Sequence, residues 1–329
     1  MNTPPEILHG AGPGAGNASD GGCATGAPDL LILGSAAAEG IPAFFCDCRV
    51  CREAARRGGR ETRMRTSYNI GGVLQIDFGP DAMQAFQGHR DRLMSIRHIL
   101  FTHAHGDHLL PSQLCYHGEG FCGTPSPEIL VHGSEPTIRR IRGDLESAAP
   151  GVGADERLRR ARIATRVFRP PEIVELPDIG ARIHALPADH APDLDAAVFL
   201  VEICGRSFLI GNDTGILPDA TWKALAALRG EVRIDVAVLD NTGGFLHDWR
   251  SGHMGANAVM ETFDRLDGLG LLSAGCVRAV NHFSHTSGGT HAELCAFWEP
   301  RGIVVGYDGL VLPADATLGS MSRNESMQF

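Results

Sequence analysis

Short runs of apolar residues alternate with polar loops along this chain, and most runs have the length of a β-strand. The runs that predict strands cover residues 30–33, 72–78, 96–102, 128–131, 234–239, 277–281 and 302–312. Residues 197–210 predict a hairpin that turns at Gly205. Several of these runs end in loops that carry His or Asp, so polar chemistry is expected at strand ends.

Three stretches between the predicted strands have helical character. The first begins at Pro218, which suits the first turn of a helix. The second ends at Gly268 and repeats apolar side chains at helical spacing, namely Val259, Phe263 and Leu266. The third follows Thr290, a potential cap. Interspersed strands and helices predict a layered α/β protein, and because no central linker is visible we expect a single domain.

Composition limits the classes of partner. The chain has 329 residues, of which 43% are hydrophobic, enough for a large core. A formal charge of -10 disfavours a nucleic-acid partner. No apolar stretch is long enough for a membrane span. Residues 1–28 lack the pattern of a signal peptide and predict a flexible extension, 29–313 the folded domain, and 314–329 a loose tail. We expect a cytoplasmic protein that acts on a small-molecule substrate and can form a homodimer.

A dense cluster of potential metal ligands follows the run at 96–102. Four of them fall within six residues: His103, His105, Asp107 and His108. Imidazole and carboxylate groups suit zinc, manganese or iron. One tetrahedral ion cannot easily use all four and keep an open position, whereas two ions sharing the loop can. A polar turn with solvated His is the alternative, and the spacing at a strand end favours metal.

Three further ligands lie downstream in loops or at strand ends: His190, Asp213 and His282. Each is weak evidence alone, because an Asp after a strand is more often a turn residue or a helix cap. His184 remains an alternative to His190. As an ordered set, the three reinforce the His–Asp cluster.

Cys46, Cys48 and Cys51 crowd into six residues near the start of the predicted domain. Three thiolates at this spacing suit a closed tetrahedral zinc site that lacks one ligand. His285 is our candidate for the fourth ligand, with His291 and Cys295 as rivals. Buried free thiols or a redox pair are the alternatives.

The run His103-Ala104-His105-Gly106-Asp107-His108, followed by the downstream set, resembles the metallo-β-lactamase superfamily. The resemblance implies a four-layer αββα sandwich with two divalent ions, zinc or manganese, at one edge. It implies that one ion is held by His103, His105 and His190. The other would be held by Asp107, His108 and His282, with Asp213 bridging. A hydroxide between the ions would be the nucleophile, and Asp107 would also orient it.

A narrower resemblance covers about residues 30–313. The three-Cys loop, His282-Phe283-Ser284-His285 and Gly306-Tyr307-Asp308-Gly309 together are similar to the phosphoribosyl cyclic phosphodiesterases of the carbon–phosphorus lyase pathway. That family implies a structural zinc on Cys46, Cys48, Cys51 and His285, and the opening of a cyclic phosphodiester. It also implies a catalytic role for His253 near the substrate. A ring that merely caps or packs is the alternative for His253.

Other functions share the same pattern. A carbon-ester, lactone or thioester hydrolase would use the same metal pair, and a tRNA-end nuclease would need a basic exosite. The Cys loop also resembles the B protein of pyrroloquinoline quinone biosynthesis, whose His–Asp loop is degraded, whereas the loop here is complete. Two features bear on substrate choice. The first is Arg60, Arg63 and Arg65, which would form either a phosphate pocket or a solvated surface run. The second is the Arg- and Ala-rich segment 135–171, which departs from both families.

Overall fold

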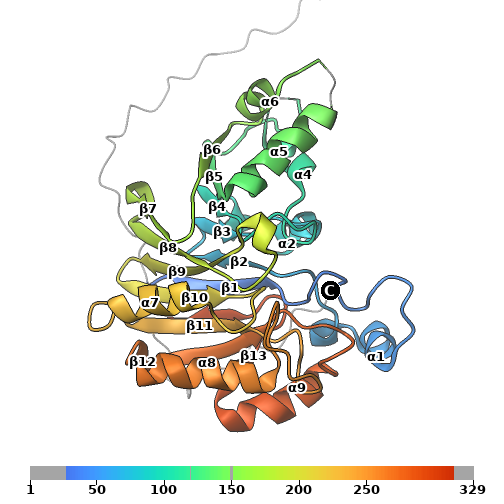
Figure 1. The fold of residues 1–329 in the computed structure, drawn as a ribbon. Helices are drawn as coiled ribbons and strands as arrows, with labels where there is room; N and C mark the ends of the chain where they lie inside the picture. Colours follow the sequence, from blue (N-terminus) through green and yellow to red (C-terminus); the bar gives the residue numbers. More distant parts are fainter. Residues whose placement is uncertain (1–26, 119, 149–150, 315–329) are drawn as a thin grey trace, which may run out of the picture.

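Two seven-stranded β-sheets form the centre of the molecule in a computed structural model that describes residues 27–118, 120–148 and 151–314 (Figure 1). The first sheet contains, in spatial order, β14 (Val311–Pro313), β1 (Asp29–Gly34), β2 (Ser67–Ile70), β3 (Leu74–Ile76), β4 (His98–Leu100), β5 (Ile129–Gly133) and β6 (Ile163–Val167). The second contains β13 (Ile303–Val305), β12 (Leu272–Asn281), β11 (Ile234–Asp240), β10 (Arg206–Gly211), β9 (Ala197–Ile203), β8 (Ala181–Pro187) and β7 (Glu172–Leu176).

The two sheets share one pattern of strand directions. In the first, β1, β2 and β3 are antiparallel neighbours, and β3 to β6 run parallel. In the second, β7 to β10 are antiparallel neighbours, and β10 to β13 run parallel. As a result, β8, β10, β11 and β12 all point the same way, and their carboxyl ends meet at one edge of the sheet.

Helices cover the outer faces. The described part of the chain contains the helices α1 (Arg49–Arg57), α2 (Ala82–Gly88), α3 (Arg90–Leu93), α4 (Pro111–Leu114), α5 (Glu135–Ala148), α6 (Ala154–Arg160), α7 (Asp219–Ala227), α8 (Ala256–Gly268) and α9 (His291–Trp298). Helices α7, α8 and α9 lie against the second sheet, and α5 and α6 lie against the first (Figure 1). The predicted four-layer αββα sandwich is therefore confirmed.

Strand β1 shows how the sequence produces these layers. Its side chains alternate between the two faces of the sheet, as the strand period requires. Leu30 and Ile32 enter the core between the sheets, while Leu31 and Leu33 enter the core under the outer helices. Because both faces are buried, the strand reads as a continuous apolar run.

Most predicted elements are present. The hairpin turns at Gly205, which has a φ of 74°. Thr290 caps α9 in a capping box with Glu293. The prediction of one strand over 302–312 is wrong, because β13 and β14 belong to different sheets and a loop joins them. The described residues of the segment 135–171 include α5, α6 and β6. Of the two predicted tails, residues 1–26 and 315–329 lie outside the described residues.

Candidate metal centre

Polar side chains gather where the strands of the second sheet end. His190 follows β8, Asp213 follows β10, Asp240 ends β11 and His282 follows β12. The shared direction of these strands places all four side chains at one edge of the sheet. From the first sheet, Asp77 follows β3, and the loop from His103 to His108 follows β4.

Three imidazoles form the first group of the centre. His103 Nε2 lies 2.8 Å from His105 Nδ1, and His190 Nε2 lies 3.2 Å from the same atom. Their nitrogens all lie within 4.8 Å of one another. The predicted choice of His190 agrees with this placement. His184 lies elsewhere, with its Nε2 2.8 Å from Glu202 Oε1.

A second group adjoins the first. Asp107, His108 and His282 bring their ligand atoms within 4.8 Å of one another, and His108 Nε2 lies 3.0 Å from Asp107 Oδ2. Asp213 stands between the groups. Its Oδ2 lies 2.8 Å from His108 Nε2 and 2.9 Å from His282 Nε2, and its Oδ1 lies 3.7 Å from His190 Nε2. The two oxygens of Asp213 therefore face both groups.

Whether the centre fits a metal ion can be tested by asking how its inward-facing atoms are hydrogen-bonded. His108 Nε2, His282 Nε2 and Asp213 Oδ2 are buried, and none has a hydrogen-bond partner of acceptable geometry within the described residues. Buried polar atoms without hydrogen bonds are costly. Nitrogen and carboxylate atoms that face one another across a common point suit divalent transition metals, so the donor set fits such ions.

Neighbouring groups hold the opposite nitrogen of three rings. Asp77 Oδ2 lies 2.7 Å from His108 Nδ1, and Thr242 Oγ1 lies 2.7 Å from His282 Nδ1. His190 Nδ1 lies 3.0 Å from the carbonyl oxygen of Gly252. Contacts of this kind fix the tautomer and the orientation of a metal-binding imidazole. Each ring therefore presents Nε2 to the centre.

Asp240 is a residue that the sequence did not single out. It is fully buried, and its oxygens accept hydrogen bonds from the backbone N–H groups of Asp213, Thr242 and Met254. Its Oδ2 also lies 3.1 Å from His253 Nδ1. Asp240 thus holds both the backbone of the central Asp213 and the ring of His253. The signal available was an Asp at the end of an apolar run, which is common without a site.

His253 lies beside the two groups. Its ring centroid is 4.9 Å from that of His190 and 5.5 Å from that of His282. Since Asp240 holds Nδ1, the second nitrogen is Nε2, on a side chain that is 26% exposed. Burial lowers the pKa of His253, but the hydrogen bond to Asp240 and the charges of Asp213 and Asp107 outweigh it and raise the pKa to about 9. The imidazole can therefore carry a proton at neutral pH.

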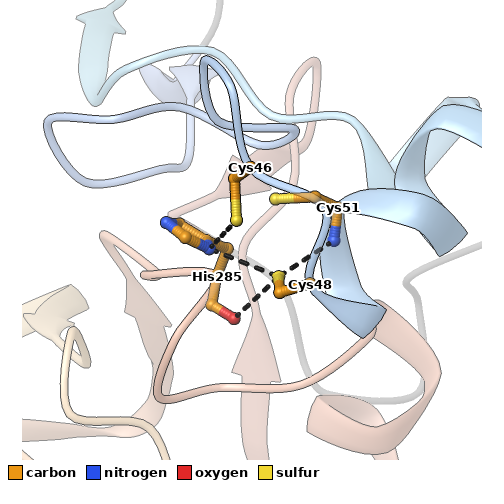
Figure 2. A group of neighbouring side chains, drawn as sticks. All are labelled: Cys46, Cys48, Cys51 and His285. Atoms are coloured by element: carbon orange, nitrogen blue, oxygen red, sulfur yellow. Dashed lines mark hydrogen bonds between the residues drawn. The ribbon is translucent and has the colours of Figure 1, made fainter.

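The three cysteines and His285 form a separate cluster (Figure 2). Cys46 Sγ lies 3.5 Å and Cys48 Sγ 3.4 Å from His285 Nδ1. The ligand atoms of Cys46, Cys48, Cys51 and His285 all lie within 4.8 Å of one another. Burial raises the pKa of Cys48, but the backbone N–H of Cys51 and the ring of His285 lower it to about 6. This donor set fits one tetrahedral zinc ion.

The rival ligands are occupied elsewhere. His291 Nδ1 lies 3.0 Å from Arg63 Nη2, and its Nε2 lies 3.5 Å from Cys295 Sγ.

Arg63 is 4% exposed and donates to the carbonyl oxygen of Gly306. Arg63 therefore belongs neither to a phosphate pocket nor to a solvated surface run. Its buried side chain binds the loop between β13 and β14.

Comparison with known proteins agrees with this geometry. Residues 74–272, more than half of the chain, match the family model described as a beta-lactamase superfamily domain. The chain belongs to this superfamily. It has the metallo-β-lactamase fold, with a buried His–Asp cluster suited to metal, and is a metal-dependent hydrolase by family and site.

Solved structures share the fold at low sequence identity. A new diphosphatase from the PhnP family has a TM-score of 0.62 and 22% identity, over 87% of this chain and 96% of that chain. Zinc-bound PqqB from Methylobacterium extorquens has a TM-score of 0.64 and 19% identity, over 86% and 99%. The short form of human tRNase Z has a TM-score of 0.52 and 17% identity, over 88% and 100%. These identities show the fold alone.

One curated protein shares a shorter region. The octanoyltransferase of Porphyromonas gingivalis is 38% identical over 85 residues, which are 24% of this chain and 16% of that protein. The chain thus spans a small part of the length of that relative. Among the described residues, no helix has both the length and the apolar character that crossing a membrane requires.

Proposed function

We propose that the protein is a phosphodiesterase that hydrolyses a small phosphodiester, in the favoured case a cyclic sugar phosphate. His103, His105 and His190 would hold one divalent ion, and Asp107, His108 and His282 another, with Asp213 shared between them. The ions would be zinc or manganese, and when bound they supply an activated water and neutralise charge on the phosphoryl group. Cys46, Cys48, Cys51 and His285 would hold a structural zinc.

The placement of His253 is the observation that favours a phosphodiester as the substrate. A sugar alkoxide is a poor leaving group and needs a proton as the bond to phosphorus breaks. The ring of His253 lies beside the rings of His190 and His282, and Asp240 fixes its Nδ1. Its Nε2 would donate a proton to the leaving oxygen, while Asp240 stabilises the protonated ring. Asp107 would orient the attacking water.

The site argues against a non-hydrolytic role. The alternative is the B protein of pyrroloquinoline quinone biosynthesis, which has a similar Cys loop but a degraded His–Asp loop. The complete loop from His103 to His108, whose ligand atoms lie near those of His190, Asp213 and His282, supports hydrolysis instead. A net charge of -10 also remains unfavourable for a nuclease that binds tRNA.

A substrate panel tests the proposal. Metal-loaded protein would be assayed with cyclic nucleotides and cyclic sugar phosphates, a linear nitrophenyl phosphodiester, a lactone, a carbon ester and a thioester. Asp107→Ala is the control for turnover by a contaminating enzyme. We expect the wild type to prefer the cyclic phosphodiesters. Preferred hydrolysis of the lactone, ester or thioester, absent in the control, would replace the phosphodiesterase assignment.

A further inference from the structure

Gly252 is the point at which the loop that carries His253 returns to the body of the protein. Residues 246–251, which precede it, are all exposed. Met254, which follows His253, is buried. A group that acts in catalysis must be placed accurately, because a shift of about 1 Å can cost about 100-fold in rate. The way in which Gly252 is held therefore bears directly on His253.

Two carboxylates hold the backbone on either side of His253. Asp240 Oδ1 accepts a hydrogen bond of 3.0 Å from the N–H of Met254. Asp189 Oδ2 accepts one of 3.2 Å from the N–H of Gly252. Asp240 is the last residue of β11, and Asp189 lies in the loop after β8. Two separate parts of the second sheet therefore fix the backbone before and after His253.

Gly252 also connects His253 to the first metal group. His190 Nδ1 lies 3.0 Å from the carbonyl oxygen of Gly252, so an N–H at Nδ1 donates to it. Asp189 and His190, which are adjacent in sequence, thus hold the N–H and the carbonyl group of a single residue. Gly252 has a φ of 73°, which glycine adopts readily. The separation of His253 from the first metal group is set through this contact.

Asp189 is itself fixed by the loop after β10. Its backbone N–H donates a hydrogen bond of 2.9 Å to Thr214 Oγ1, and its carbonyl oxygen accepts one of 3.1 Å from the N–H of Gly215. The N–H of Ile216 donates to the carbonyl oxygen of Arg250, 2.9 Å away. This last bond does not involve the Asp189 side chain. Removal of the carboxylate should therefore release Gly252 while the loop stays attached through Arg250.

We propose that Asp189 is a positioning residue that places His253 beside the first metal group by holding the N–H of Gly252. This inference rests on the proposed function and adds a residue to its general-acid step. Asp189 acts through the backbone next to His253 and not on the reacting atoms. The competing explanation is that Asp189 only stabilises the loop that carries His190. Its loss would then weaken metal binding and slow the hydrolysis of every substrate alike.

Substitutions that differ by one acceptor oxygen separate the two explanations. Asp189→Ala removes the acceptor, whereas Asp189→Asn keeps an oxygen that can accept from Gly252. The matched control is Asp193→Ala, since Asp193 is an exposed acid in the 3-10 helix Pro192–Leu194 that follows His190. If Asp189→Ala does not fold, Asp189→Glu takes its place, because its longer side chain moves the acceptor.

The full chain with its metals bound would be used for each variant. Metal content and melting temperature would be measured first. The kcat and KM would then be measured with 2′,3′-cyclic AMP, whose leaving group is a sugar alkoxide, and with bis(p-nitrophenyl) phosphate. Hydrogen exchange of the Gly252 amide, followed by NMR, reports on the proposed contact without any turnover.

We expect Asp189→Ala to keep its metals and to lose about 10- to 100-fold in kcat with the cyclic nucleotide, but less than about 3-fold with the nitrophenyl ester. Its Gly252 amide should exchange faster than that of the wild type. Asp189→Asn and Asp193→Ala should resemble the wild type in each measurement. In a His253→Ala background, Asp189→Ala should cause no further loss, because two residues that act through one step are not additive.

Loss of metal from Asp189→Ala, or equal losses with both substrates, would overturn the proposal in favour of the structural role. Unchanged exchange of the Gly252 amide would contradict it as well, and so would a further loss in the His253→Ala background. Failure of the proposed function would appear separately, as absent phosphodiester turnover in wild-type protein with its metals bound.

Discussion

Orientation of single side chains governs the chemistry proposed for this centre. The imidazoles of His108, His190 and His282 are each held through Nδ1 by a neighbouring oxygen, so that Nε2 faces inward. Asp213 and His282 also have positive φ angles, of 50° and 65°. Residues other than Gly adopt this region at a cost, and such strain is typical of functional sites. The surrounding contacts are therefore part of the site.

Removal of a central carboxylate tests the residue roles. Asp107→Ala and Asp213→Ala should each abolish hydrolysis while the protein stays folded, because both side chains face the metal groups and lie outside the apolar cores. Turnover and circular dichroism would be measured on the same samples. Near wild-type turnover in either variant would show that its carboxylate has been assigned the wrong role.

The effect of His253→Ala should depend on the leaving group. General acid catalysis contributes about 10²–10⁴-fold, and it matters most for a poor leaving group. The variant should therefore hydrolyse a cyclic sugar phosphodiester far more slowly than the wild type, and a nitrophenyl phosphodiester only slightly more slowly. The measurement is kcat for both substrates. Equal losses would mean that His253 binds or positions phosphate, and no loss would make it a structural residue.

The proposed ligands were visible in the sequence, whereas the residues that hold them were not. The His103–His108 cluster has a spacing that few structural loops share, and the downstream residues follow it in order. Asp77 and Asp240 are single acids after apolar runs, the same pattern as an ordinary turn. Their roles depend on His108 and His253, which are 31 and 13 residues away, so only the folded chain reveals them.

At the scale of elements, the loops of the centre are packed backbone to backbone. A Cβ at Gly79 would lie 1.9 Å from the carbonyl oxygen of Asp107. The loop after β3 therefore approaches the His–Asp loop as closely as only glycine permits. The positions of the ligands depend on this contact as well as on their own side-chain partners.

Gly79→Ala should displace the His–Asp loop and weaken metal binding. A matched control is Gly143→Ala in helix α5, where a Cβ would meet nothing within 4 Å. Alanine there should raise the free energy of unfolding by about 0.5–1 kcal/mol. Metal affinity by chelator competition and thermal unfolding would be compared for both variants. Wild-type metal affinity in Gly79→Ala would show that the loop tolerates the shift.

The Cys loop should act on stability and leave the catalytic centre intact. Cys48→Ser should remove one zinc per chain and lower the melting temperature, because metal binding adds to the free energy of folding. Cys115→Ser, at a free cysteine outside the cluster, is the control. Zinc content and melting temperature would be measured together. Full zinc with an unchanged melting temperature would exclude Cys48 from metal binding.

Element prediction succeeded where the apolar runs were long and failed where sheet membership mattered. Strands β4, β10 and β11, which lead into the site, were found, since they are buried on both faces. Strand β8, which leads to His190, was missed. The run 302–312 gave no sign that it changes sheets, because β13 and β14 are each three residues long. Helix α1 was also missed. Only Val50, Cys51 and Ala54 of this helix are buried, too few for a clear apolar pattern.

At the scale of the whole molecule, the centre exists because the two sheets present their strand ends at one edge. The first sheet supplies His103, His105, Asp107 and His108, and the second supplies His190, Asp213 and His282. Neither sheet alone completes either group, since each group takes ligands from both. The Cys cluster likewise joins the loop before α1 and the first turn of α1 to the loop after β12 (Figure 2). Three metals are thus expected to connect distant parts of the chain.

Metal content tests the central claim most directly. Protein produced in metal-replete medium would be analysed by elemental mass spectrometry before and after remetallation. We predict three metals per chain in the wild type, two at the His–Asp centre and one zinc at the Cys cluster, and two in Cys48→Ser. A value near one in fully folded wild-type protein, unchanged by remetallation, would contradict the binuclear centre.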